Sequence, residues 1–334
     1  LLVYLIVLSI GGTKKIAFLA SLIVSVYPSY LYFGSVLLKD TVVIPLVLAN
    51  MLLFVKMLKN FSWLRFLTFF IILTGLINLR FYIGYALMFS FIFCWPLLSI
   101  LSVKKRIIYW LMILFFLGFS PQILGNGYYG FNTFKKMLNS EKITYYREIL
   151  YNNNSPLNSQ PTISQQPTTP QPTTTQPTTP PPITPPPTTL QQKPSEQVLN
   201  GNGSTFVLET GFKEGFFKFL KNSLQSFSYS LLGPFPWQFK YQRQIIGLIE
   251  TIPWYLLIIV SIYGFIRFII KNGFLKFLKY YKFCLPFLLF GLFALGALSL
   301  FINNYGIIAR IRIPIFICFI SIMFISFNYK PIEQ

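Results

Sequence analysis

Clusters of Lys and Arg occupy every second gap between the hydrophobic blocks of this chain. The blocks are 1–10, 16–37, 41–55, 66–79, 81–101, 107–124, 251–270, 283–302 and 313–327. The marked gaps hold Lys14 and Lys15; Lys56, Lys59 and Arg65; Lys104, Lys105 and Arg106; Arg267, Lys271, Lys276, Lys279 and Lys282; and Lys330. Short loops rich in Lys and Arg stay in the cytoplasm in polytopic membrane proteins. The alternation therefore predicts one topology, in which these gaps face inward and the others outward.

Composition independently indicates an integral membrane protein. Of 334 residues, 54% are hydrophobic and only 11% are charged, too few to make a water-soluble surface. A helix needs roughly 20 apolar residues to cross about 30 Å of hydrocarbon. We expect an all-α, multi-pass protein of the plasma-membrane type with about nine spans. The short blocks 41–55 and 66–79 fit either tilted spans or interfacial segments. The net charge of +20 is explained by topology and by attraction to anionic lipid, rather than by nucleic-acid binding.

The order of these segments predicts five regions. They are an N-terminal transmembrane bundle of about six spans (1–124), an extracytoplasmic amphipathic segment (125–155), a Pro/Thr/Gln-rich linker (156–200), an extracytoplasmic interfacial-helix segment (201–250) and about three C-terminal spans (251–334). Residue 1 is a Leu inside an apolar run, with no Met and no charged region before it. We therefore expect at least one further span upstream of it.

The long outward segment contains a linker flanked by amphipathic stretches. Residues 156–194 hold 13 of the 23 prolines, with QPTT at 166, 171 and 176, a composition typical of disordered, extended chain. Sequons at Asn153 and Asn202 suit an exported, glycosylated stretch. Residues 130–151 and 205–232 mix aromatics with Lys at helical spacing, as in helices that lie in the membrane interface. Such helices either cap the bundle or shape a groove for a lipid-linked substrate.

Residue types exclude several chemistries. The chain has no His, and Cys94, Cys284 and Cys318 lie singly in apolar blocks without metal-ligand spacing. Zinc, haem and Cys-His nucleophilic chemistry are thereby excluded, and buried thiols that pack as small hydrophobes are the ordinary interpretation. Mg²⁺ or Mn²⁺ bound through oxygen stays open as a cofactor, although only eight carboxylates could ligate it.

Charged residues at the outward ends of the spans are the candidates for chemistry. Charge at the membrane boundary of a helix bundle costs free energy and therefore indicates function. The candidates are Lys39, Asp40, Arg80, Glu250, Arg310 and Arg312. Several guanidinium groups around one or two carboxylates suit a phosphate, because Arg offers a bidentate fork to its oxygens. Ordinary interfacial anchoring is the alternative, above all for Arg80 taken alone. We expect Asp40, Arg310 and Arg312 to approach one another despite their separation in sequence.

Three stretches carry a resemblance to a known group of enzymes. They are YPSYLYFGSVLLKDTVVIPLVLANMLLF (27–54), LLGPFPWQF (231–239) followed by IETIPWYLL (249–257), and NNYGIIARIRIPIFIC (303–318). In this order they resemble segments of GT-C superfamily membrane glycosyltransferases, the group of the family 39-like protein O-mannosyltransferases and the lipid A aminoarabinose transferases. There a Lys/Arg-Asp pair follows a Pro in the second outward turn, and an R-x-R-x-P element opens a late span.

The resemblance implies a GT-C-like helix bundle that transfers a sugar from a polyprenyl- or dolichyl-phosphate donor. The acceptor would be a hydroxyl of a glycan, lipid or protein at the extracytoplasmic face. It implies that Arg310, Arg312, Arg80 and Lys39 bind the lipid phosphate and that Asp40 is the second acidic position, with Glu250 a further candidate. The principal catalytic acid of the superfamily lies in the first outward loop, which would precede Leu1, so Asp40 is expected to bind substrate or metal.

Two other classes of function stay open. A transporter or flippase of lipid or polysaccharide typically places charged or helix-breaking residues near mid-span in a repeated pattern. Here the charges cluster at span ends, without an internal repeat. A non-catalytic membrane scaffold that displays the Pro/Thr-rich segment is the other alternative. The sequence leaves the sugar, the acceptor, the carrier lipid's length and the oligomeric state undetermined.

Overall fold

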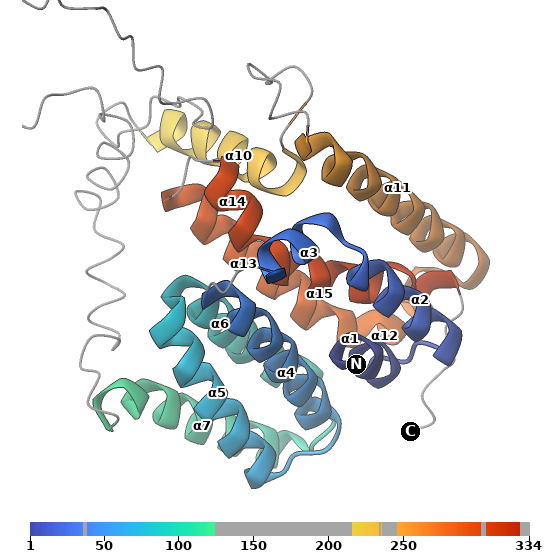
Figure 1. The fold of residues 1–334 in the computed structure, drawn as a ribbon. Coiled ribbons are helices and arrows are strands. Elements are labelled where there is room, and N and C mark those ends of the chain that lie inside the picture. Colours follow the sequence, from blue (N-terminus) through green and yellow to red (C-terminus); the bar gives the residue numbers. More distant parts are fainter. Residues whose placement is uncertain (36–38, 124–215, 234, 236–245, 302–304, 328–334) are drawn as a thin grey trace, which may run out of the picture.

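The computed structural model describes residues 1–35, 39–123, 216–233, 235, 246–301 and 305–327 (Figure 1). These residues form helices and short connections with no β-strand element, which confirms the all-α prediction for this part of the chain. The helices are α1 Leu2–Ser9, α2 Lys14–Ser25, α3 Pro28–Ser35, α4 Lys39–Lys59, α5 Trp63–Leu79, α6 Phe81–Leu98, α7 Val103–Ile123, α10 Phe216–Leu232, α11 Ile246–Asn272, α12 Phe274–Tyr280, α13 Leu285–Phe301, α14 Tyr305–Ile311 and α15 Ile313–Met323. Short 3-10 turns, η4 Tyr281–Cys284 and η5 Ile325–Phe327, precede α13 and follow α15.

Each predicted hydrophobic block overlaps at least one of these helices. By length and composition, four described segments can cross a membrane, and five can if the bent pair α2–α3 is one span. The four are Asp40–Lys59, Phe81–Leu98, Thr251–Asn272 and Phe274–Leu300, while Trp63–Leu79 and Ile313–Phe327 are shorter apolar helices. The protein thus has the helices of a multi-pass membrane protein. The predicted total of about nine spans, larger than these four or five, stays a prediction.

The block 16–37 differs from the single span that its hydropathy predicts. Helix α2 ends at Ser25, and α3 begins at Pro28 after a bend of 55°. Proline has no backbone N–H and disfavours helical conformation in the residue before it, which favours a break at Pro28. Pro45, Pro96 and Pro253 are nevertheless accommodated inside α4, α6 and α11. The bend leaves α3 as a short helix that packs on α2, α4, α11 and α14.

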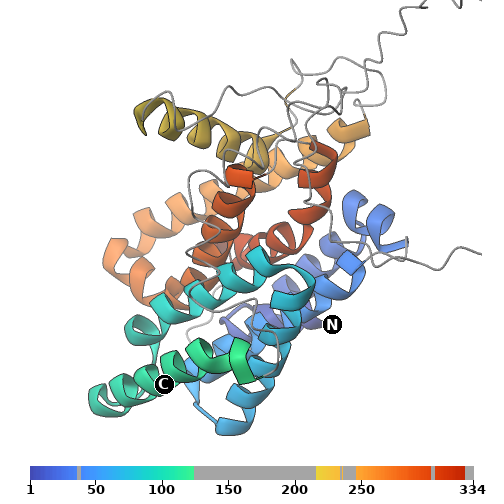
Figure 2. The same ribbon diagram turned by 90° about the vertical axis from the view of Figure 1, so that its left-hand side faces the viewer.

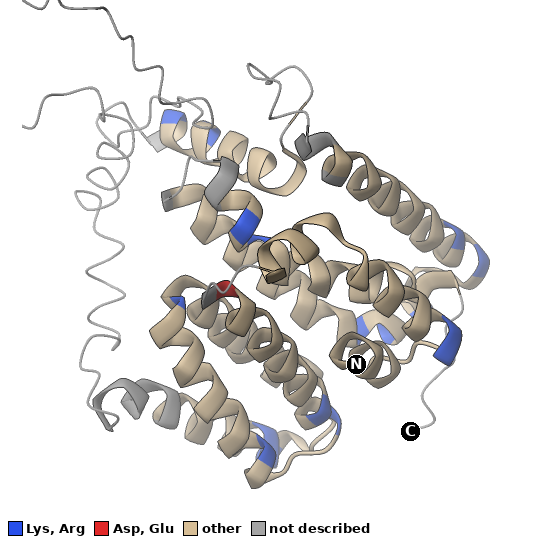
Figure 3. Ribbon diagram, viewed as in Figure 1, with Lys and Arg blue, Asp and Glu red and all other residues tan. Residues whose placement is uncertain are grey.

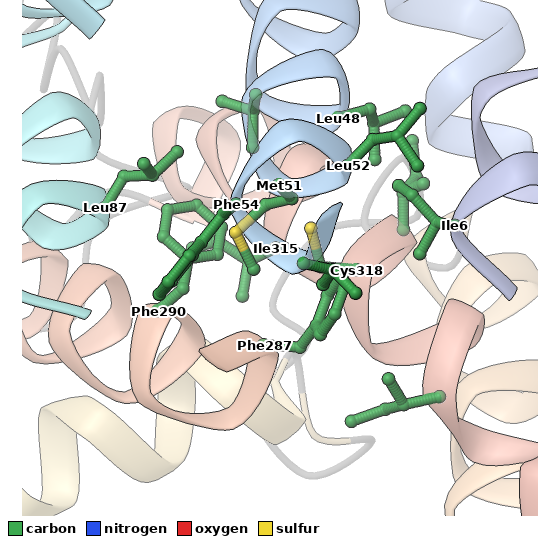
Figure 4. Packing of buried hydrophobic residues seen from close by; sticks show 14 of the residues in the cluster. Ile6, Leu48, Met51, Leu52, Phe54, Leu87, Phe287, Phe290, Ile315 and Cys318 are labelled. Atoms are coloured by element: carbon green, nitrogen blue, oxygen red, sulfur yellow. The ribbon is translucent and has the colours of Figure 1, made fainter. Parts of the chain in front are cut away.

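The core is formed where helices from the first and last parts of the chain pack together. Met51 and Phe54 of α4 lie close to Phe287 and Phe290 of α13 and to Ile315 of α15 (Figure 4). Helix α6 packs along α13, and α1 lies against α4 and α15. These core side chains are fully or almost fully buried, and dense apolar packing of this kind fixes the relative positions of the helices.

The outer helices expose apolar side chains, as lipid-facing surfaces do. Ile108 and Phe115 on α7, and Ile259, Ile266 and Ile270 on α11, are all at least half exposed. Such continuous apolar faces would be unfavourable in water but match the hydrocarbon of a bilayer. The structure contains no membrane, so the assignment follows from the side chains themselves.

Basic residues of the predicted inward gaps gather at one end of the bundle (Figure 3). At this end the Lys59 ammonium group donates to the carbonyl of Ser9, where α1 ends, and the backbone N–H of Ile100 donates to Leu58 at 3.1 Å. Asp40 begins the same helix that Lys59 ends, so it lies at the opposite end of the bundle. The structure therefore separates the two kinds of gap as the alternation predicts. Which end faces the cytoplasm stays a prediction.

The predicted linker and its flanks lie mostly outside the described residues. This holds for 125–155, for 156–200 and for both sequons. Helix α10 is the described part of the stretch 205–232 that we interpret as interfacial. It exposes Phe217, Leu220 and Leu224 along one side, while Ser226 and Ser230 are buried. An exposed apolar side flanked by lysines is the pattern of a helix at a membrane surface.

Gly84 lets α6 approach α5 closely, which yields a test of the packing. A Cβ at Gly84 would lie 2.5 Å from Cγ1 and 2.9 Å from the backbone nitrogen of Ile77, whereas a Cβ at Gly75 would meet nothing within 4 Å. We expect Gly84→Ala to lower the free energy of unfolding by about 1–3 kcal/mol through overpacking. Gly75→Ala should leave it unchanged or raise it slightly. Thermal unfolding of the two purified variants in detergent measures the difference, and equal stability would contradict the close approach.

Candidate functional site

The carboxylate of Asp40 binds two arginines from distant parts of the chain. Asp40 lies in the first turn of α4, Arg80 at the turn between α5 and α6, and Arg310 in the last turn of α14. The Asp40 side chain is only 8% exposed. It is the sole acidic side chain among those that the structure describes (Figure 3). The site thus joins three segments that 270 positions of sequence separate, as the sequence predicts for Asp40 and Arg310.

Arg80 binds the carboxylate through two nitrogens of its guanidinium group. Its Nε donates to Oδ1 of Asp40 at 2.9 Å and its Nη2 to Oδ2 at 3.0 Å. Helix α5 ends at Leu79 and α6 begins at Phe81, so Arg80 lies in an extended conformation between two helices and its side chain turns toward α4. With 12% of its side chain exposed, Arg80 is part of the site rather than a free interfacial anchor.

Arg310 meets the same carboxylate through a less complete contact. Its Nε lies 2.8 Å from Oδ2 of Asp40, but the angles are not those of a hydrogen bond, so the contact is ionic. The side chain is 29% exposed, and no hydrogen bond to its terminal nitrogens occurs among the described residues. Two guanidinium groups and one carboxylate leave a net charge of +1. Arg310 therefore presents donors and positive charge to an incoming anion.

Tyr82 is a site residue that the sequence analysis missed. Its hydroxyl lies in the electrostatic field of Asp40, Arg80 and Arg310. The oxygen is buried and close to Arg80, yet it makes no hydrogen bond of good geometry with any described group. A buried hydroxyl without a partner costs free energy, and such groups in native proteins usually serve a ligand or a water. One aromatic residue in an aromatic-rich block gives no sequence signal for this role.

Arg312, the second arginine of the pair, contacts the end of α10. Its guanidinium is buried, with Nη1 2.5 Å from the carbonyl oxygen of Gly233 and 3.5 Å from that of Ser230, and it lies over the ring of Phe316 at 4.7 Å. Both carbonyls belong to the C-terminal end of α10, where backbone acceptors have no helical partner. Arg312 thus holds α10 on the bundle, and its expected role as a phosphate ligand stays a prediction.

Two aromatic residues of α11 complete this attachment of α10. The Trp254 indole donates to the carbonyl of Leu231 at 3.0 Å, and the Tyr255 hydroxyl donates to that of Leu232 at 2.6 Å. The Trp254 ring also stacks on Phe316, with centroids 3.9 Å apart and planes at 7°. With Arg312, these donors satisfy the last turn of α10. We call this group, Arg312, Trp254, Tyr255 and Phe316, the α10 clamp.

The other predicted site residues are placed only by their backbones. Lys39 begins α4 next to Asp40, and Glu250 lies in the first part of α11, but both side chains lie outside the described set. Their expected roles stay predictions. Among the described residues, no three His, Cys, Asp or Glu side chains lie close enough together to hold a metal ion. Around Asp40 the donors are guanidinium groups rather than oxygens, which does not fit Mg²⁺ or Mn²⁺.

A cavity of about 350 Å³ opens beside the first turn of α4. Thr41, next to Asp40, lines it together with Ile44 and Leu48 of the same helix. Its other walls come from α1, α2, the α3 residue Tyr30 and Ile317 of α15. The lining is mainly apolar, with serines of α2 at one side, so the cavity suits a hydrocarbon chain more than a sugar.

Comparison with known proteins leaves this chain unassigned: no family model, no curated protein and no solved structure matches it.

The ion cluster predicts a large effect of neutralising its carboxylate. We expect Asp40→Asn to lower the free energy of unfolding by about 3 kcal/mol or more, because two partly buried guanidinium groups would lose their counter-charge. Arg65→Gln is the matched control, since Arg65 binds the exposed carbonyl of Asn60, and should cost under about 0.5 kcal/mol. Chemical or thermal unfolding in detergent measures both. Equal costs would show that the cluster does not stabilise the fold.

The α10 clamp makes a separate prediction for backbone protection. Arg312→Gln should raise hydrogen exchange in α10 by roughly tenfold or more, because the lost charge-assisted bonds each stabilise by about 1.5–3 kcal/mol. Exchange in α4 and α5 should change little. Mass spectrometry of peptides from 216–233 measures the effect, and protection of α10 equal to wild type would contradict the clamp.

Proposed function

We propose that this protein is a membrane glycosyltransferase of GT-C-like architecture, which moves a sugar from a polyprenyl- or dolichyl-phosphate donor to an acceptor hydroxyl at the extracytoplasmic face. One observation carries the proposal. Arg310 is held in place by the buried Asp40 carboxylate through Nε, while the rest of its guanidinium has no hydrogen bond among the described residues. A preorganised cation of this kind stabilises the charge that develops on a phosphate leaving group.

Within this proposal the three charged residues have different roles. Arg80 fixes the orientation of Asp40 through two hydrogen bonds, and Asp40 in turn orients Arg310. Both carboxylate oxygens are thus engaged, an arrangement suited to holding arginines rather than to taking a proton from an acceptor. Arg310 is the phosphate ligand. The buried Tyr82 hydroxyl beside it supplies a neutral donor that needs a partner.

The neighbouring cavity supports a lipid-linked donor over a soluble one. Its apolar lining begins at Thr41, one residue from Asp40, and continues down α4 through Ile44 and Leu48. A prenyl chain that entered there would bring its phosphate to the level of Arg310. Burial of such a chain favours binding by roughly 0.8 kcal/mol per methylene. The exposed apolar side of α10 supports a position of the same end of the bundle at a membrane surface.

The reaction under this proposal is a displacement at the anomeric carbon. The acceptor oxygen forms the new bond to that carbon, the bond from carbon to the phosphate oxygen breaks, and the phosphate leaves with the electron pair. A carboxylate takes the acceptor's proton. Both oxygens of Asp40 already hold arginines, so a different carboxylate would take this proton.

Substitution of Arg310 by Lys tests the phosphate contact. The charge is kept, but an ammonium group cannot bind Asp40 through one nitrogen and a phosphate through the others of a planar fork. We expect the transfer rate to fall on the order of a hundredfold, equivalent to about 2–4 kcal/mol of lost stabilisation. The assay is transfer of labelled sugar from polyprenyl-phosphate donors by full-length protein in detergent.

Arg106→Lys serves as the matched control. Arg106 lies at the opposite end of the bundle, where it contacts the carbonyl of Ser99, so the variant should transfer sugar at the wild-type rate. Equal rates for wild type, Arg310→Lys and Arg310→Ala would remove the phosphate assignment. Absence of transfer from every such donor would favour the transporter or scaffold instead.

A further inference from the structure

Two lysines at the other end of the bundle lie against one aromatic ring. The ammonium nitrogen of Lys59, at the end of α4, is 5.0 Å from the centroid of Phe283, and that of Lys282 is 5.1 Å from the same centroid. Phe283 is buried, and both lysines are partly buried. The chain thus brings two positive charges from distant segments to one place. We call Lys59, Lys282 and Phe283 the lysine pair site.

Nothing in the described part of the chain neutralises this pair. Lys59 donates to the carbonyl of Ser9 at the end of α1, which supplies a partial negative charge only. Asp40, the sole acidic side chain among those described, lies 19 residues earlier on the same helix, roughly 28 Å away at 1.5 Å per residue. Two like charges that are held together and partly shielded from water repel each other, and an anion between them removes that cost.

The position of the pair indicates what kind of anion reaches it. Lys59 is the last residue of the candidate span Asp40–Lys59. Lys282 lies eight residues into the candidate span Phe274–Leu300, in the 3-10 turn just before the apolar helix α13. The ends of α1 and α6 are at the same level, as the Ser9 and Ile100 contacts show. Residues at the end of a span face the headgroup layer, where lipid phosphates lie.

We propose that the lysine pair site binds the phosphate of an anionic membrane lipid, such as a phosphatidylglycerol headgroup. The two ammonium groups donate to the phosphate oxygens, and the Phe283 ring and the α1 end keep both lysines in position. The lipid joins α4 to the start of α13 at the end of the bundle opposite to Asp40. This inference does not rest on the proposed glycosyltransferase function, since it needs neither donor nor activity.

Ligand-dependent thermal unfolding tests the site. Purified protein in a neutral detergent is titrated with phosphatidylglycerol, with phosphatidylcholine or with inorganic phosphate, and the unfolding midpoint is recorded. A lipid that binds only the folded protein raises the midpoint with concentration. We expect phosphatidylglycerol to do so for wild type. Lys282→Gln and Lys59→Gln should each lower its apparent affinity tenfold or more, because a charge-assisted hydrogen bond is lost.

Lys279→Gln is the matched control. Lys279 is exposed on α12 at the same end of the bundle, and its substitution removes the same charge. It should bind phosphatidylglycerol within about twofold of wild type. If Lys59→Gln does not fold because it loses the bond to Ser9, Lys282→Gln alone tests the site. Wild-type affinity in Lys282→Gln would overturn the site. Equal stabilisation by phosphatidylcholine or inorganic phosphate would overturn the assignment to an anionic lipid.

Discussion

The pairing of one buried carboxylate with two guanidinium groups is the interaction on which the arrangement of this bundle depends. Charges that are withdrawn from water remain stable only with partners, and Asp40 supplies the partner for both Arg80 and Arg310. Because the three residues come from α4, the α5–α6 turn and α14, the contact fixes how the first and last parts of the chain meet. Apolar packing holds the helices close together, and the ion cluster adds a directional contact between α4, the α5–α6 turn and α14.

The same constraint accounts for the contrast between the two ends of the bundle. Helix α4 carries its carboxylate in the first turn and its lysines in the last, roughly 28 Å apart. That length is close to the thickness of a hydrocarbon core, so each set of charges reaches a polar layer while the apolar residues between them stay in lipid or in the core. Among the described residues, one end therefore combines a carboxylate with excess positive charge, and the other has lysines and arginines without a carboxylate. Both arrangements leave positive charge for phosphate, on opposite sides.

The sequence was sufficient for the helices and for part of the site. Hydrophobic blocks and their charged gaps predict most helices. The cost of charge at a membrane boundary puts Asp40, Arg80 and Arg310 among six candidates, although it favours simple anchoring for Arg80 taken alone. The break before Pro28 was missed because a hydropathy pattern carries no information on backbone geometry. Tyr82, Trp254 and Tyr255 were missed for another reason. Their roles depend on which backbone or charged group lies opposite them, and in a chain with 20 tyrosines and five tryptophans the residue type alone carries no such information.

Arg310 and Arg312 show how one short segment serves two purposes. Two positions along a helix differ by about 200° in direction, so side chains at these positions face opposite ways. Arg310 accordingly meets Asp40 on one side of the α14–α15 junction, while Arg312 meets the end of α10 on the other. Helix α10 exposes an apolar side that suits a membrane surface. A shift of this helix would move Arg312, and through the single residue between them it would also move Arg310. The arginine that we assign to phosphate and the helix that we assign to the membrane surface therefore cannot move independently.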